Sequence, residues 1–475
     1  MVALLLGLWG IRRQGTMWRD ESVTYQVAHR SLPEIRNLLE NIDIVHGLYY
    51  LLMKALFSIW DGGLITLRLP SVLAMAIAAA CVALLGHQLA GPRAGLIAGS
   101  IFPLIPSIQQ YAQEGRSYAL VCALVALSTY LLVRTISRPS KQLWLAYTAT
   151  LLIACLLHEF AVLALLAHGS TLFLARLPLA LRRSWAMSAG AVVAGLSPLA
   201  VLSMRQSDQI SWLGHPSWAQ WSAFAAQAIL GIICALVPTR ATGSPVRLRT
   251  LALPLLTLPT AALLLASLHK PVYIDRYVLY STIALALLAG SALDWLWRSD
   301  PLQRLLPAHG LRVTVAAISL TAILAALLPI HLHLRTPQSR KDNVTAVAET
   351  VQRAAAPGDG VLFMPARRRE WAMSYPHEFR NVRDLALHQD PAASHSLQGT
   401  ELPAQQIRSR ILDTPRIVTL NDPAGQPLDM TAQEIAKRTT LRAFFQKCST
   451  TRVTGAQITV YARPGHCGAT SDAGR

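Results

Sequence analysis

Charged residues are scarce in this chain, and acidic residues are the scarcest: Asp and Glu number 25 against 43 Lys and Arg, and charged residues together make up only 14% of the sequence. Hydrophobic residues make up 53%. This composition is typical of a polytopic membrane protein and not of a soluble globular protein. The 475 residues leave room for about ten spans of ~20 residues and a soluble domain.

Several short motifs are also missing. The sequence has no glycine-rich phosphate loop, no Cys-x-x-Cys pair and no serine-nucleophile elbow. An ATP-driven pump is therefore disfavoured. The formal net charge of +18 does not indicate a nucleic-acid partner, because the arginines lie in short connectors between apolar runs.

Cysteine is rare, with six residues. Four lie in apolar runs, where a thiol acts as a small hydrophobic group. The other two, Cys448 and Cys467, lie in the polar C-terminal part. If that part is outside the cytoplasm, the two thiols are free to pair; two unpaired thiols are the alternative.

Apolar runs recur along the first 330 residues, and every second connector between them is basic. By the positive-inside rule, basic connectors are cytoplasmic, which places the first loop and the C-terminal part outside. The first run has only about ten apolar residues against the ~20 needed for a perpendicular span, so we expect an upstream start or a tilted helix. A cleaved signal peptide is disfavoured because no basic segment or small-residue cleavage site is present. The eleven runs are residues 2–11, 69–90, 95–110, 117–133, 143–157, 160–175, 185–202, 222–237, 250–268, 278–297 and 313–330.

Two domains are expected. Residues 1–330 form a mostly α, polytopic transmembrane bundle with a long first extracytoplasmic loop at 12–63. Residues 331–475 are richer in Pro, Asp, Arg and Gln and form a small extracytoplasmic α/β domain. Its predicted strands are residues 360–364, 416–420 and 456–461. Its predicted helices are residues 345–356 and 431–437.

The dipeptide Asp20-Glu21 follows the first apolar run directly. Adjacent carboxylates at the point where a membrane begins are usually functional. The alternative is a pair of solvated charges in the first turn of a surface helix, where acidic residues are favoured. Later in this loop, apolar residues at helical spacing predict a helix on the membrane surface. These residues are Leu32, Ile35, Leu38 and Leu39.

The next outward connector places Glu114, Arg116 and Tyr118 within five residues. In a continuous helix Arg116 would point away from the other two, so a helix break or a helix start is expected here. Two later outward points carry His158 and Arg276. The alternatives are interfacial snorkelling cations for the arginines and a ligand-free helix-end residue for His158.

In their order, these segments resemble the membrane glycosyltransferases that take sugars from polyprenyl phosphates. The resemblance is to the GT-C branch that holds protein O-mannosyltransferases and the lipid A aminoarabinose transferase (glycosyltransferase family 39). It covers the first 120 residues well and the rest loosely. One departure is at His46, which is followed by Gly47-Leu48 where the family has His-Pro-Pro. The matching segments are Asp20-Glu21, Asp43 to Leu52, Arg68 to Ser71, Gln113 to Tyr118 and Arg276-Tyr277.

The resemblance implies roles for these residues. A carboxylate is needed to deprotonate an acceptor hydroxyl, and this base would be Asp20, supported by Glu21. Glu114 would orient the acceptor, or help Asp20 to hold a divalent cation (Mg²⁺ or Mn²⁺). Guanidinium groups bind phosphate oxygens in pairs, a role expected of two arginines, with three further side chains lining the donor head group. The two arginines are Arg116 and Arg276, and the lining residues are His46, Tyr118 and His158.

The resemblance also implies partners. The donor is a polyprenyl-phosphate-linked sugar, mannose by default, transferred with inversion to a protein, polysaccharide or lipid glycan. Apart from the resemblance, the Arg-rich and Ala-rich usage is typical of a bacterium of high genomic GC content, so the expected location is a plasma membrane. The alternating basic connectors place the active face outside the cytoplasm, which disfavours cytoplasmic nucleotide-sugar donors. The main alternative is a lipid-linked sugar flippase or transporter. It is disfavoured because the halves show no repeat and the charges lie at span ends. A scaffold that has lost catalysis is a third possibility.

Overall fold

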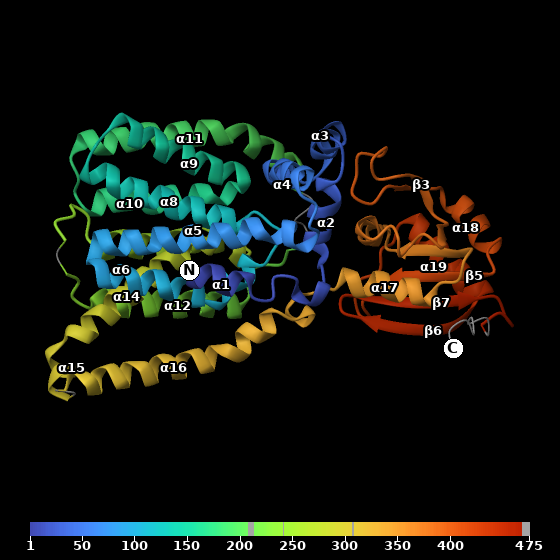
Figure 1. Ribbon diagram of the computed structural model, residues 1–475. Coiled ribbons are helices and arrows are strands. Elements are labelled where there is room, and N and C mark those ends of the chain that lie inside the picture. Colours follow the sequence, from blue (N-terminus) through green and yellow to red (C-terminus); the bar gives the residue numbers. More distant parts are fainter. Residues whose placement is uncertain (208–212, 241, 306–307, 468–475) are drawn as a thin grey trace. The chain divides into compact units, whose positions relative to one another are not determined.

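A computed structural model describes residues 1–207, 213–240, 242–305 and 308–467 of the chain (Figure 1). The α-helices are α1 (Val2–Leu8), α2 (Arg19–Ala28), α3 (Leu32–Asn41), α4 (Gly47–Ile59), α5 (Leu64–Ala90), α6 (Pro92–Ile101), α7 (Pro106–Ala112), α8 (Tyr118–Ser137), α9 (Lys141–Leu157), α10 (Ala164–Leu174), α11 (Leu179–Arg205), α12 (Trp218–Leu236), α13 (Leu248–Ala266), α14 (Thr282–Arg298), α15 (Asp300–Leu305), α16 (His309–Leu334), α17 (Val344–Ala354), α18 (Ala404–Leu412) and α19 (Ala432–Phe444). The strands are β1 (Asp359–Met364), β2 (Val382–Asp384), β3 (Leu387–Gln389), β4 (Thr400–Glu401), β5 (Arg416–Asn421), β6 (Gln446–Val453) and β7 (Ala456–Ala462).

Every apolar run expected from the sequence contains helix, which confirms the mostly helical membrane fold. Seven helices within the described ranges are long and apolar enough to span a membrane. The first run holds only the seven-residue α1. The run at 95–110 is divided between α6 and α7, because Pro103 and Pro106 lack the N–H that a continuous helix needs. The expected number of eleven spans is therefore not established by helix length.

The structure divides into two compact units that interleave along the sequence. The first, here called the helical unit, comprises Met1–Ile11, Asp43–Tyr49 and Arg68–Leu332. The second, here called the mixed unit, comprises Arg12–Ile42, Tyr50–Leu67 and His333–Arg475. Much of the first loop thus groups with the C-terminal residues, whereas the domains expected from the sequence are consecutive.

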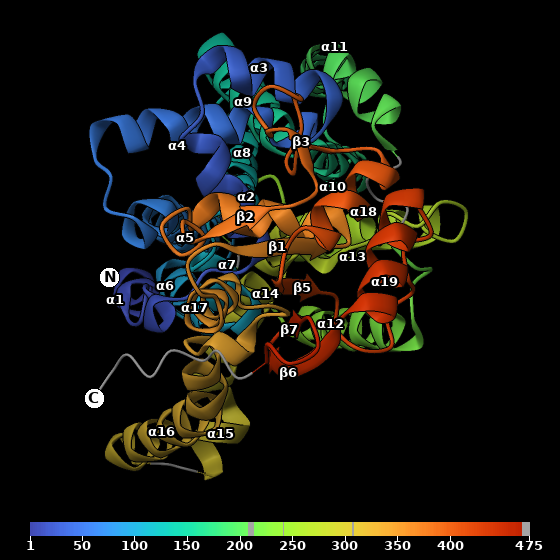
Figure 2. The same cartoon turned by 90° about the vertical axis from the view of Figure 1, so that its right-hand side faces the viewer.

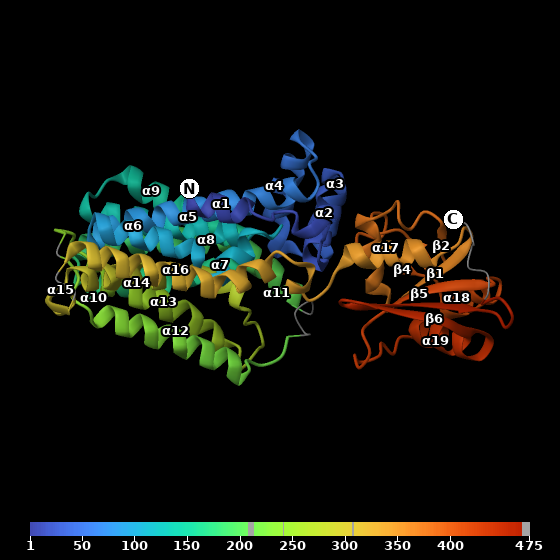
Figure 3. The same ribbon diagram turned by 60° about the horizontal axis from the view of Figure 1, so that its bottom comes forward.

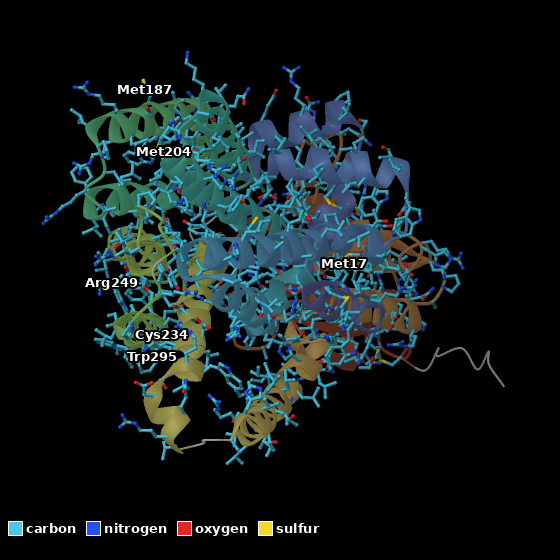
Figure 4. All side chains as sticks on the ribbon, turned by 60° about the vertical axis from the view of Figure 1, so that its left-hand side comes forward. Met17, Met187, Met204, Cys234, Arg249 and Trp295 are labelled. Atoms are coloured by element: carbon cyan, nitrogen blue, oxygen red, sulfur yellow. A yellow bond between two sulfur atoms is a disulfide. The ribbon has the colours of Figure 1, made fainter. Side chains whose placement is uncertain are left out.

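In the helical unit, long helices run side by side. In Figure 1, α9 lies between α8 and α11, and Figure 3 shows α12, α13 and α14 together. The outer helices face away from the unit: Met187 and Met204 project from α11 in Figure 4, and both are exposed. No residue in the most apolar stretch of α16 is buried inside the protein. Apolar side chains that no protein covers are expected of lipid-facing helices.

Close packing in this unit depends on small residues. A Cβ added at Gly290 of α14 would lie 2.7 Å from both the backbone nitrogen and the Cβ of Ala98 in α6. Real side chains do not tolerate such distances, so any larger residue would push the two helices apart. Small residues at helix interfaces are characteristic of packing inside membranes.

In the mixed unit, a five-stranded sheet has the order β2-β1-β5-β7-β6. The first three strands are parallel, and β7 and β6 each run antiparallel to their neighbours. One face packs on α17 and the other on α18 and α19, giving three layers (Figure 2). The α/β domain and its three expected strands are confirmed as β1, β5 and β7, because runs of β-branched residues were long enough to mark them.

A disulfide joins Cys448 in β6 to Cys467 just after β7, with 5.4 Å between the Cα atoms. It closes the open edge of the sheet onto the chain that follows the last strand. The other four cysteines are free thiols, and all four lie in the apolar helices of the helical unit.

The helix α3 forms where the sequence predicts it, but its apolar face has a different neighbour. Ile35 and Leu38 are fully buried against Val23 and Val27 of α2 and against Leu397. The predicted role of this face as a membrane-surface contact is therefore wrong. A stripe of apolar residues at a period of 3.6 indicates one buried face, and it does not distinguish lipid from protein.

A buried ionic network crosses the same unit. The Lys437 ammonium donates to the Glu434 carboxylate at 2.6 Å, to the Glu401 carboxylate at 2.8 Å and to the Phe363 carbonyl at 2.9 Å. Arg369 donates to Glu401 at 2.7 Å. All three Lys437 donors are satisfied, and both carboxylates depend on buried cations.

Substitution of Lys437 by Met should destabilise the mixed unit strongly. It leaves buried carboxylates without their main counter-charge, at a cost of about 3–5 kcal/mol, or a fall of roughly 6–12 °C in the melting temperature. Thermal unfolding of the full chain in detergent measures this. The control Lys447→Met removes an exposed lysine and should change little. Equal melting temperatures for both variants would contradict the prediction.

Candidate active site

The helix α2 carries the predicted base. Its first residue is Arg19, so Asp20 and Glu21 lie in the first turn, where a carboxylate interacts favourably with the helix dipole. The two side chains differ in environment, since Asp20 is half-buried and Glu21 is fully buried. The alternative of two solvated charges therefore does not describe Glu21.

Glu21 forms an ion pair with Arg13, at 3.3 Å between Nη1 and Oε2, and both side chains are at most 1% exposed. Arg13 and Gln14 hold positive φ values of 44° and 55°. Such values are uncommon for residues other than glycine, and clusters of strain are typical of functional sites. This loop conformation thus places the buried Arg13 guanidinium against Glu21 in the first turn of α2. No pattern in the sequence marks this pair, because Arg13 is one of several cations in the first loop.

C-terminal residues of the mixed unit hold α2 in place. The Arg19 guanidinium pairs with Glu370, and the Ser22 hydroxyl contacts the Ser374 hydroxyl at 2.7 Å. The backbone N–H of Arg19 donates to Asp342 at 2.6 Å. Residues more than 300 positions apart in sequence therefore fix the orientation of the turn that carries Asp20.

Burial raises the pKa of Asp342 to about 6 from its usual 3.8. The hydrogen bond from the Arg19 N–H opposes the rise, the Asp20 carboxylate adds to it, and the Arg19 and Arg368 guanidinium groups oppose it. Because the folded state binds this proton more tightly than the unfolded state, the stabilisation from Asp342 is complete below about pH 4. It is lost as the pH rises through about 6.

The Asp342→Asn variant should therefore be more stable than wild type near pH 7.5, by about 1–3 kcal/mol, and nearly equal to it near pH 4. The amide oxygen can still accept the Arg19 N–H. Thermal unfolding of the full chain between about pH 4 and 8 measures the difference. The exposed control Asp413→Asn should follow the wild-type curve, and parallel curves for all three proteins would contradict the prediction.

In the helical unit, the chain breaks between α7 and α8, as expected for the segment with Glu114, Arg116 and Tyr118. All three side chains are buried. Two hydrogen bonds fix the break: the Ser71 hydroxyl of α5 donates to the Glu114 carbonyl at 2.6 Å, and the Gln113 amide donates to the Trp9 carbonyl at 2.6 Å. Because the helix breaks here, Glu114, Arg116 and Tyr118 are not held at the fixed angles of a continuous helix.

Aromatic rings surround His158, which lies between α9 and the 3-10 helix Glu159–Leu163. Ring centroids lie 4.3 Å away in Tyr277, 5.6 Å in both Tyr118 and Phe160, and 6.2 Å in His46. The buried His158 Nδ1 has no hydrogen-bond partner among the described residues. Residue Phe160 was missed from the sequence, because a single Phe in an apolar run carries no signal.

Burial holds the pKa of His158 well below its usual value, and nearby His46, Arg276 and Arg116 add to the effect. The ring is therefore neutral near pH 7. The charges of two guanidinium groups thus act on this ring from Arg116 and Arg276, which are 160 residues apart in the sequence. Neutral His158 leaves the positive charge of the cluster on the arginines.

Arg276 contributes a guanidinium group to this cluster. Its guanidinium carbon lies 5.1 Å from the centroid of the Tyr118 ring, a cation–π distance. The neighbouring Asp275 accepts a hydrogen bond from the Tyr111 hydroxyl at 3.3 Å. The 3-10 helix Asp275–Ser281 is thereby tied to α7.

His46 ends the 3-10 helix Ile44–His46, and Gly47 continues into α4 with φ of −55°. The preceding Asp43 is left-handed, with φ of 61°, and the Ile44 N–H donates to Gln206 at 3.0 Å. The absence of the two prolines therefore leaves an ordered turn that brings His46 to His158.

The helical unit thus gathers predicted residues from four separate segments: His46, Glu114, Arg116, Tyr118, His158 and Arg276. Asp20 and Glu21 belong to the mixed unit. Across the part of the chain that the structure describes, no group of three or more His, Cys, Asp or Glu side chains is arranged to hold a metal ion.

Part of the chain is similar to a known protein family. Residues 48–203 match the family described as dolichyl-phosphate-mannose-protein mannosyltransferase. Over this range the chain resembles membrane glycosyltransferases of the GT-C type. The matched range includes Glu114, Arg116, Tyr118 and His158. No curated protein sequence matches the chain.

The chain also shares its fold with solved structures. ArnT from Cupriavidus metallidurans, in its undecaprenyl phosphate-bound structure and in its apo structure, superposes with a TM-score of 0.59. In each case the sequence identity is 12%, and the alignment covers 97% of this chain and 96% of the other. The likeness therefore extends over the transmembrane helices and the C-terminal residues alike.

Proposed function

We propose that this glycosyltransferase moves a sugar, mannose by default, from a polyprenyl phosphate to an acceptor hydroxyl outside the cytoplasm, with inversion at the anomeric carbon. The observation that carries the proposal is the cluster around His158, where the Arg276 guanidinium lies over the Tyr118 ring, aromatic rings surround the imidazole, and the charge of Arg116 acts on it. Guanidinium groups suit phosphate oxygens, and aromatic faces suit the apolar faces of sugars.

Two comparisons support a lipid-phosphate donor. The matched family is named for dolichyl-phosphate-mannose, and the ArnT structure contains undecaprenyl phosphate. Both lipids present a phosphate at the membrane surface with an isoprenoid tail in the bilayer. The lipid-exposed helices of the helical unit are suited to receive such a tail. Mannose itself rests on the family name alone.

In the proposed reaction, Asp20 accepts the proton of the acceptor hydroxyl as its oxygen attacks the anomeric carbon. The bond from that carbon to the phosphate oxygen breaks on the opposite face, so the configuration inverts. Polyprenyl phosphate leaves, and Arg116 and Arg276 stabilise its developing charge. Glu21 supports the turn through Arg13, and Glu114 orients the acceptor. Tyr118, His46 and neutral His158 line the head group.

A divalent cation held by Asp20 and Glu114 is an optional part of this proposal, and no step above depends on it. The described residues offer no larger donor cluster. Treatment with EDTA, followed by addition of Mg²⁺ or Mn²⁺, tests for it. Loss of transfer that either ion restores would add the cation to the site.

The function is tested with the full chain in proteoliposomes, supplied with polyprenyl-phosphate mannose labelled in the sugar and with a cell-envelope extract as acceptor. The expected result is labelled acceptor together with unlabelled polyprenyl phosphate. Donors carrying glucose, arabinose or aminoarabinose, assayed in parallel, define the sugar. Movement of labelled donor across the bilayer without any transfer would instead favour the flippase.

The C-terminal residues should lie outside the cytoplasm. The disulfide between Cys448 and Cys467 is consistent with an oxidising compartment, and the alternating basic connectors give the same orientation. An alkaline phosphatase reporter fused after Cys467 and expressed in a bacterium should be active, while a green fluorescent protein fused there should be dark. The reverse pattern would contradict the extracytoplasmic location.

A further inference from the structure

A polar pocket of about 230 Å³ lies entirely within the mixed unit. Its cationic lining residues are Arg19, Lys341, Arg367 and Arg368, its carboxylates are Asp342, Glu370 and Asp422, and its other lining residues are Trp371, Pro423, Gln426 and Gly455. The proposed reaction uses none of these side chains. Arg19 is nevertheless the residue directly before the proposed base in α2.

Two of the three carboxylates of the pocket are already engaged by its own cations, and the third, Asp342, accepts the Arg19 backbone N–H. Asp422 accepts from Arg368 at 2.6 Å and also pairs with Arg367, so one carboxylate serves two guanidinium groups. Glu370 is buried and pairs with Arg19. Lys341 forms no ion pair with another described residue. Cations are therefore in excess.

The excess charge lies at the rim. The side chains of Arg19 and Arg367 are 44% and 50% exposed, and Lys341 is exposed as well. Their carboxylate partners are buried or nearly so, and thus fix the guanidinium groups without covering them. A ligand that enters the pocket meets positive charge first.

One lining residue is a tryptophan whose hydrogen-bond donor is unused. Trp371 is 2% exposed, and its indole N–H has no hydrogen-bond partner among the described residues. A buried polar group without a partner carries an energetic cost that a ligand can relieve. The Arg368 guanidinium lies over the Trp371 ring, 4.2 Å from its centroid, so the ring holds this cation in place.

One wall of the pocket depends on a glycine. Gly455, in the turn between β6 and β7, has φ of +85°, and a Cβ there would lie 2.3 Å from the Cβ of Asp342. The Asn343 N–H donates to the Thr454 carbonyl at 3.0 Å, which holds the turn against this segment. The pocket wall therefore has a defined shape.

We propose that this pocket binds an anionic group, phosphate or carboxylate, carried by a sugar of the acceptor. The cationic rim selects oxyanions, since guanidinium groups match their planar or tetrahedral oxygens, and the unpartnered Trp371 N–H can donate to a sugar hydroxyl. An acceptor held here contacts Arg19, one residue from Asp20. The identification of the ligand as the acceptor rests on the proposed function. The preference of the pocket for an anionic sugar does not depend on it.

Binding to the full chain in detergent tests the pocket without requiring transfer. The probes are glucose 6-phosphate, glucuronate, methyl glucoside and inorganic phosphate, each titrated by calorimetry. We expect the two charged sugars to bind, methyl glucoside not to bind, and inorganic phosphate to bind at least 10-fold more weakly than glucose 6-phosphate. The Lys341→Gln and Arg367→Gln variants should each weaken charged-sugar binding at least 5-fold. The control Lys447→Gln, an exposed lysine of the same unit, should bind as wild type does.

The outcomes separate this inference from the proposed function. Normal transfer without binding of any charged sugar would overturn the pocket assignment alone. Binding of inorganic phosphate as tight as that of glucose 6-phosphate would overturn its assignment to a sugar. Charged-sugar binding in a chain that transfers nothing would leave the pocket in place and remove the proposed function. In the transfer assay, Lys341→Gln should raise the KM for acceptor at least 5-fold and leave the KM for donor unchanged.

Discussion

Replacement of Asp20 by Asn should reduce sugar transfer by about 10²–10⁴-fold, the usual contribution of a general base, and leave donor binding intact. The amide keeps the size of the side chain and its place in the first turn of α2, but it cannot accept the hydroxyl proton. Initial rates with labelled polyprenyl-phosphate mannose measure the loss, and binding of the unlabelled donor to the purified chain measures what is retained.

The matched control for this variant is Asp61→Asn. Asp61 is half-exposed, belongs to the same unit and pairs with His29 at 3.1 Å, and an exposed pair of this kind contributes about 0–1 kcal/mol. We expect wild-type transfer from it. Equal rates for Asp20→Asn and wild type would remove Asp20 from the role of base. If Asp20→Asn lowered both the transfer rate and the affinity for donor, Asp20 would instead have a role in positioning the donor.

Local signals predicted the elements well, because local residue patterns determine them. Strands β1, β5 and β7 are short runs made mostly of apolar and β-branched residues. The break between α7 and α8 followed from a conflict, since a continuous helix could not direct Glu114 and Arg116 to the same side. Both kinds of signal depend on neighbours within a few positions.

Contacts between distant segments could not be predicted in this way. Arg13 lies eight residues from Glu21 in a turn with two left-handed residues, and no pattern in the sequence marks that conformation. Arg19 and Glu370 are 351 positions apart. The apolar face of α3 was recognised but assigned to lipid, because its periodicity is the same against either neighbour. The groups that surround a buried side chain could therefore be identified only from the structure.

Replacement of Arg276 by Gln should reduce transfer by about 10²–10³-fold, the loss typical when one group that stabilises developing charge is removed. Its guanidinium lies over Tyr118 and close to His158, where burial keeps His158 neutral, so the arginines alone supply positive charge to the cluster. Loss of a phosphate contact should weaken the donor complex and slow the chemical step. Both KM for donor and kcat should therefore change.

Two further variants show whether charge or fork geometry is responsible. Arg276→Lys keeps the charge but offers a point donor in place of a planar fork, so it should recover only part of the lost activity. Lys270→Gln removes an exposed cation from the same connector and should transfer as wild type does. If Lys270→Gln lost as much activity as Arg276→Gln, the effect would come from general surface charge. Because Arg276 is only half-buried, the substitution should leave the fold intact, and an unchanged melting temperature assigns the loss to the site.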